Sequence, residues 1–130
     1  MPEYPLKFDT GVMVFEVTIA GKSRLIPLKM VFDTGATLTT IPKEAAIAIG
    51  CDPVKSDRRI EMITASGTEY VPVVVIPKIK WLDFEIEKVE AICHNLPPQT
   101  TISGLLGLNV LRKFDIGIHF NKSTIGINKF

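Results

Sequence analysis

The residues best suited to chemistry in this sequence are Asp33, Thr34 and Gly35, which directly follow an apolar run at residues 30–32. Three consecutive apolar residues indicate a strand that is buried on both faces. A carboxylate at the end of such a strand is costly to bury unless it is hydrogen-bonded or shares a proton with a neighbour. The pattern therefore indicates a rigid, half-buried acid suited to acid–base chemistry. The alternative is a surface turn, because Asp, Thr and Gly are common turn residues.

The same three letters occur a second time, as Asp9, Thr10 and Gly11. This copy precedes the first apolar run of the chain and does not end a strand. We therefore predict that Asp9 lies in a solvated turn at the start of the domain. The tripeptide alone is weak support for a catalytic acid, and it is the context of Asp33 that distinguishes it.

The segments that must position Asp33 are predicted to be strands. Residues 12–19 alternate between apolar and polar side chains, which indicates a half-buried strand, and residues 24–32 return as the strand that ends at Asp33. Pro27 predicts that the early part of this second strand lies at a sheet edge or has a bulge. A short Ala- and Ile-rich helix is predicted at residues 43–49.

Two strand-like runs, residues 58–65 and 68–76, are separated by Ser66 and Gly67, which are a good two-residue turn. Two interpretations of this hairpin are open. It is either an ordinary exposed turn or a mobile lid, since small residues at a tip let backbone amides close over an extended ligand.

A second apolar run stops at a glycine, in the sequence Leu105, Leu106, Gly107. It indicates another buried strand that ends sharply, and a short helix is predicted after it at residues 108–114. The remaining predicted strands are residues 79–81, 84–93, 115–120 and 124–128. Together these segments predict an all-β protein with two short helices.

A chain of 130 residues is long enough for one domain with a core that needs no disulfides. Its net charge of +1 gives no reason to expect a nucleic-acid partner, and its longest apolar stretch is too short to cross a membrane. Cys51 and Cys93 are interpreted as two buried free thiols in a reducing compartment, and no basic-then-apolar leader opens the sequence. Neither they nor His94 and His119 have metal-ligand spacing. We therefore expect a cytoplasmic protein without metal or cofactor.

In their order and spacing, these motifs resemble those of the retropepsin-like aspartic proteases, the single-domain family that includes the retroviral proteases. Residues 31–36, Val-Phe-Asp-Thr-Gly-Ala, are similar to the catalytic motif of that family. Residues 105–111 are similar to its second signature, in which two apolar residues precede a glycine and a short helix. Residues 62–70 fall where the family has its flap. The resemblance covers nearly the whole chain and is closer to bacterial and archaeal members than to a viral enzyme. The flap tip departs from the retroviral pattern, because it has one glycine, Gly67.

The resemblance implies an all-β, closed acid-protease barrel with a flap hairpin and two short helices, in which residues 1–130 form one domain of a homodimer. It implies an aspartic endopeptidase that hydrolyses polypeptides with water held between two Asp33 carboxylates, one per subunit. Thr34 would brace the two loops against each other, and Gly35 would let them approach. The resemblance assigns substrate binding to Ala36, Ala65, Ser66, Gly67 and Thr68, and support of the active-site loop to Leu105, Leu106 and Gly107.

The chemistry gives a separate reason to expect a second subunit. Two carboxylates about 3 Å apart cannot both ionise, so they share one proton and act as base and acid together. This chain has one acid in the required setting, so the second must come from another copy. Two alternatives stay open: a catalytically silent dimerisation or peptide-binding module with the same fold, and a small β-barrel of unrelated function in which Asp33 is a turn residue.

Overall fold

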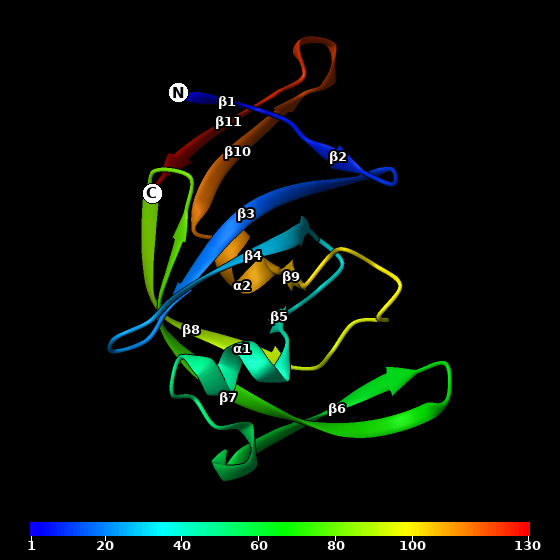
Figure 1. The fold of residues 1–130 in the computed structure, drawn as a ribbon. Helices are drawn as coiled ribbons and strands as arrows, with labels where there is room; N and C mark the ends of the chain where they lie inside the picture. Colours follow the sequence, from blue (N-terminus) through cyan, green and yellow to red (C-terminus); the bar gives the residue numbers. More distant parts are fainter.

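The fold is dominated by an eight-stranded sheet, shown in the computed structural model of Figure 1. The structure describes residues 1–130 except for the side chain of Thr64. In spatial order the strands are β2 (Phe8–Asp9), β3 (Val12–Ala20), β4 (Leu25–Phe32), β9 (Gly104–Leu106), β5 (Thr39–Ile41), β8 (Phe84–Cys93), β7 (Gly67–Trp81) and β6 (Arg58–Thr64). β3 also pairs with β7, so the pairings run from β3 through β4, β9, β5, β8 and β7 and back to β3. The prediction of an all-β protein is confirmed.

A smaller sheet contains both ends of the chain. Its order is β1 (Glu3–Pro5), β11 (Thr124–Lys129) and β10 (Phe114–His119), and it lies at the top of the view in Figure 1. A short 3-10 turn, η2 (Phe120–Lys122), joins β10 to β11, and Ser123 after it has a left-handed backbone with φ 54°. The hairpin predicted at residues 115–128 is therefore confirmed.

The helices are short and lie next to the β5 and β9 strands. α1 (Lys43–Ala48) follows Pro42, and the chain turns away at Gly50, whose φ of +85° favours glycine. α2 (Leu108–Leu111) comes directly after β9, and one further 3-10 turn, η1 (Pro53–Lys55), leads toward β6. The prediction of a helix at residues 108–114 was too long, because Phe114 already begins β10 and is buried there.

The core is formed by buried side chains from both sheets and both helices, and it includes Trp81, which has no exposed surface. Its ring makes edge-to-face contacts with Phe15 and Phe114 at centroid distances of 5.5 and 5.4 Å. Val17 and Ile19, on the alternating face of β3, are fully buried beside it. The strand predicted at residues 12–19 is confirmed, and from Phe15 to Ile19 burial alternates as expected, although Val14 on the other face is buried as well.

Two strand boundaries differ from the predictions. β6 ends before Ala65 and β7 begins at Gly67, so the hairpin turns at Ala65 and Ser66 and not at Ser66 and Gly67. Gly67 takes φ +121° as the first residue of β7, which explains why a glycine stands beside the turn and not in it. β7 is one strand of 15 residues and does not break near Pro77. Pro77 is tolerated because the pairing with β8 passes from Ile76 opposite Val89 to Lys78 opposite Glu87 and leaves Pro77 unpaired.

Candidate active site

Asp33 follows the last residue of β4, at the point where β4 lies against β9. The two strands are parallel, with Met30 opposite Gly104 and Phe32 opposite Leu106. The pairing continues one step beyond β4, because the main-chain N–H of Asp33 donates to the carbonyl oxygen of Leu106 at 3.0 Å. The place of the acid is therefore set by β9 as well as by its own strand.

The backbone after Asp33 turns back on the acid. The N–H of Gly35 donates to Oδ1 of the Asp33 carboxylate at 2.9 Å, and the N–H of Ala36 donates to the Asp33 carbonyl at 3.2 Å. Asp33 is half-buried, whereas Thr34 and Gly35 are exposed at the surface of the isolated chain. The arrangement orients one carboxylate oxygen and leaves the exposed side of the loop available to another molecule.

The chain around Gly107 packs directly beneath this loop. A Cβ atom at Gly107 would lie 2.6 Å from the carbonyl carbon of Leu38 and 2.8 Å from the backbone nitrogen of Thr39. The N–H of Leu108 donates to the carbonyl of Ala36 at 2.8 Å, and the N–H of Asn109 donates to the carbonyl of Thr37 at 3.2 Å. Only glycine permits this close approach of two backbones.

A side-chain network also joins the two segments, and sequence reasoning missed it. The N–H and the hydroxyl of Thr39 both donate to Oδ1 of Asn109 at 2.9 Å, and the same hydroxyl accepts from the N–H of Gly107 at 3.1 Å. Asn109 in turn donates from Nδ2 to the carbonyl of Glu90 at 2.8 Å. A polar Thr39 inside a buried strand and an Asn in the first turn of a helix were the available signals.

The predicted flap residues lie at the tip of the β6–β7 hairpin, away from these contacts. Figure 1 shows this hairpin projecting at the lower right, with β6 at the edge of the sheet. Its tip residues Ala65, Ser66, Gly67 and Thr68 are all exposed. The structure thus brings together the residues of the acid loop and those predicted to support it, Leu105, Leu106 and Gly107, and places the four tip residues on a separate element.

Comparison with known families decides what kind of protein has this loop. A sequence model described as aspartyl protease matches residues 15–110, which is well over half of the chain and includes both Asp33 and Gly107. The chain belongs to the aspartyl protease family. The matched stretch begins after Asp9, so the second Asp-Thr-Gly lies outside it.

The fold of this aspartyl protease family member is similar to that of a solved structure. The chain is similar to a retropepsin-like aspartic protease from Rickettsia conorii, with a TM-score of 0.74 and 20% sequence identity over 98% of this chain and 91% of that one. At that identity the likeness establishes a retropepsin-like fold. No curated protein sequence matches the chain.

The aspartyl protease chain holds its other Asp-Thr-Gly differently from the prediction. Thr10 and Gly11 do form a turn, with φ of 50° and 89°, but Asp9 is not simply solvated. Its side chain is 22% exposed and accepts hydrogen bonds from Nζ of Lys29 and from Oγ1 of Thr101. Those bonds, that of Lys29 first, lower the pKa of Asp9 below its ordinary value.

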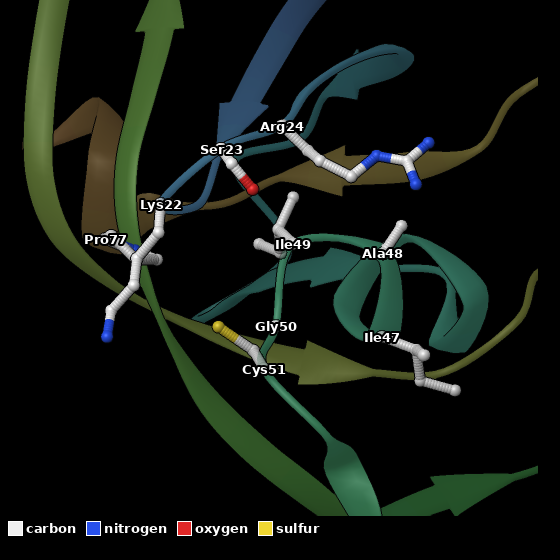
Figure 2. A pocket seen from close by; sticks show the side chains of 9 residues that line it. All are labelled: Lys22, Ser23, Arg24, Ile47, Ala48, Ile49, Gly50, Cys51 and Pro77. Carbon is white, nitrogen blue, oxygen red and sulfur yellow. The ribbon is translucent and has the colours of Figure 1, made fainter.

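The pocket in Figure 2 lies apart from Asp33. It has a volume of about 350 Å³ and lies between the end of α1 and the turn before β4. The Cys51 sulfur points toward Pro77 in this view, while the Lys22 and Arg24 side chains extend in different directions. Lys22 and Arg24 therefore do not form a positively charged site in this pocket.

Apart from the side chain of Thr64, no three or more His, Cys, Asp or Glu side chains gather as a metal-binding group. Within the same described residues, the helices are too short and too polar to span a membrane.

Proposed function

We propose that this chain is an aspartic endopeptidase that hydrolyses polypeptides between two Asp33 carboxylates, one from each subunit of a homodimer. The observation that carries the proposal is the setting of Asp33. Its carboxylate accepts from the Gly35 N–H at 2.9 Å, while its own N–H is held by Leu106, on a loop whose outer side is exposed. An acid oriented in this way and open on one side is suited to meet a second copy of itself.

Two such carboxylates would share one proton. The ionised one acts as the base that takes a proton from the attacking water, and the protonated one donates to the carbonyl oxygen of the scissile peptide. Water bonds to the carbonyl carbon and gives a tetrahedral diol that is not linked to the enzyme. The carboxyl group that took the water proton then gives it to the peptide nitrogen as the C–N bond breaks, while the other carboxylate takes a proton from the diol. An amine and a carboxylic acid leave, and the pair again holds one proton. This chemistry needs the two groups about 3 Å apart, where both cannot be ionised together.

The remaining residues take supporting roles in this proposal. The exposed Thr34 hydroxyl would bond across the two-fold axis, and Gly35 would let the two loops approach. Ala36 and the exposed tip residues Ala65, Ser66, Gly67 and Thr68 would contact the substrate. Leu105, Leu106 and Gly107 would support the loop, as the bond between Asp33 and Leu106 and the close packing at Gly107 suggest.

We also propose that residues 1–130 form one domain and that the ring of pairings through β3 and β7 is the closed barrel expected for this family. A cytoplasmic location stays a prediction.

The proposal is tested by Asp33→Asn, which keeps the size of the side chain and removes its charge. With a fluorescein-labelled unfolded protein as substrate, we expect cleavage by the unaltered chain and none by the variant, with circular dichroism and size on gel filtration unchanged. Asp83→Asn is the control, because Asp83 is an exposed carboxylate in the turn between β7 and β8. Cleavage by Asp33→Asn would refute the proposal. Binding of the substrate without cleavage by the unaltered chain would favour the silent peptide-binding module.

A further inference from the structure

Asp9 joins three parts of the chain that are far apart in the sequence. It ends β2, and its Oδ2 atom accepts from Nζ of Lys29 on β4 and from Oγ1 of Thr101, the latter at 2.7 Å and 92 residues away. Its side chain is less exposed than that of Lys29, at 22% against 43%. The carboxylate therefore lies between its two donors, with Lys29 supplying the opposite charge.

Thr101 belongs to the connecting loop at residues 94–103, which has no helix or strand of its own. At its start the loop is held to the β5–α1 region, since the N–H of His94 donates to the Ile41 carbonyl at 3.0 Å. At its end the N–H of Ser103 donates to the Lys29 carbonyl at 2.8 Å.

Between these two ends, the described hydrogen bonds of residues 96–102 are local except for the one to Asp9. They join the N–H of Thr100 to the Pro97 carbonyl and the N–H of Ile102 to the Thr100 hydroxyl. Among the hydrogen bonds of the described residues, the bond from Thr101 to Asp9 is thus the one that ties residues 96–102 to a distant part of the chain.

The anchored end of the loop lies close to the candidate active site. β9 has three residues and separates Ser103 from Gly107, which packs beneath the Asp33 loop. Four steps of about 3.3 Å lead from Ser103 to Gly107, so this separation is about 13 Å of extended peptide. Figure 1 shows the loop (yellow) on the right of the view, where the loop after β4 also lies. A substrate that extends about four to six residues from Asp33 along β9 has the length needed to reach residues 101–103.

We propose that Asp9 is a positioning residue that, through Thr101 and Lys29, holds the loop at residues 94–103 where it contacts an extended polypeptide substrate. The inference rests on the proposed function. It assigns the second Asp-Thr-Gly of the chain a role in substrate affinity and side-chain preference, with no part in proton transfer. Because Asp9 acts on the loop and not on Asp33, its loss changes KM and leaves kcat nearly unaltered.

The sharpest test compares Thr101→Val with Thr101→Ser. Valine keeps the shape of threonine and removes the hydroxyl donor to Asp9, whereas serine keeps that donor. On a panel of peptides that differ at the residues flanking the cleaved bond, we expect Thr101→Val to raise KM about tenfold, the order expected when one hydrogen bond to a charged group is lost. The ranking of the peptides changes, kcat stays within about twofold, and Thr101→Ser behaves like the unaltered chain.

Asp9→Asn should give the same pattern as Thr101→Val, and Asp83→Asn, which removes a surface carboxylate bonded to Tyr4, should give none. Hydrogen exchange at residues 100–103 should become faster in Thr101→Val and Asp9→Asn alone. Equal KM values, rankings and exchange rates for Thr101→Val and Thr101→Ser would overturn the inference while the proposed function stood. Absence of cleavage by the unaltered chain would refute both this inference and the proposed function.

Discussion

The N–H of Asp33 donates to the carbonyl of Leu106 at 3.0 Å, so the candidate catalytic acid is fixed by a strand from the far end of the chain. The carboxylate itself is turned by the N–H of Gly35. Any change that moves β9 against β4 therefore moves Asp33. This coupling makes residues beneath the loop informative targets, although none of them carries a reactive group.

Gly107→Ala should disturb the site through packing alone. Its Cβ would lie 2.6 Å from the carbonyl carbon of Leu38, which is backbone and cannot rotate away. We expect a loss of about 1–3 kcal/mol in the free energy of unfolding, as for other overpacked positions, together with reduced kcat. Urea unfolding at one fixed protein concentration measures the free energy of unfolding, and peptide cleavage measures kcat.

Gly117→Ala is the matched control for this substitution. A Cβ there would meet Nε2 of His119 at 3.4 Å, an ordinary contact, so stability should change little. Equal stability losses for the two variants would show that the approach at Gly107 is not tight.

Thr39→Val should reveal the weight of the buried polar network. The Thr39 side chain is 1% exposed, and its hydroxyl serves both Asn109 and the N–H of Gly107. Valine fills the same space and leaves these two groups without that partner, which should lower the free energy of unfolding by about 1–3 kcal/mol. Thr37→Val, at an exposed position of the same loop, is the control. Denaturant titration measures the unfolding midpoint of both variants. Equal midpoints would show that the Thr39 network does not contribute to stability.

The assembly prediction concerns Thr34. If the site is divided between two subunits, specific activity must fall as the protein is diluted below the dimer dissociation constant. Thr34→Ala should shift that fall to higher concentration, because each orphaned partner of a buried hydrogen bond costs about 1–3 kcal/mol. Sedimentation and activity should be measured over the same dilution series. Full activity in a monomer would contradict both the shared site and the role of Thr34.

The two cysteines should differ in reactivity. Both are free; Cys93 is fully buried, whereas Cys51 is half-buried, so the prediction that both are buried was correct for Cys93 alone. Burial, and then the proximity of Cys51, raises the pKa of Cys93 from 9.0 to about 11, and burial also raises the pKa of Cys51. A higher thiol pKa leaves less thiolate, by about a hundredfold for Cys93 at pH 8, so iodoacetamide should modify Cys51 first.

The alkylation is followed by mass spectrometry of samples taken at timed intervals. In the Cys51→Ser variant, which should fold normally, the remaining thiol of Cys93 should react with iodoacetamide very slowly. Rapid labelling of Cys93 in that variant would mean that the core around β8 opens readily.

Much of the site could be predicted because its signals are local. An apolar run that ends in Asp33, Thr34 and Gly35, and another that ends in Gly107, predict strands that stop sharply, and the structure has β4 and β9 at those places. The prediction that the run before Asp33 is buried on both faces was correct for Met30 alone, since Val31 and Phe32 are only half-buried in the isolated chain. The preference of Pro27 for an edge was likewise correct, since β9 pairs only with the last three residues of β4.

Other features depend on what the chain meets after folding. Nothing local distinguishes Thr39 as the partner of Asn109, 70 residues away, or shows that Asp9 meets Lys29 and Thr101 and is only 22% exposed. The sequence also predicted separate strands at residues 68–76 and 79–81, yet β7 runs through both and pairs with β8 on either side of Pro77. By itself the sequence determined which side chains are apolar, where the backbone can turn and which acid ends a buried strand. The tertiary structure alone decided which distant groups meet, because hydrogen-bond partners and close backbone approaches are set by strand order and register and not by neighbouring residues.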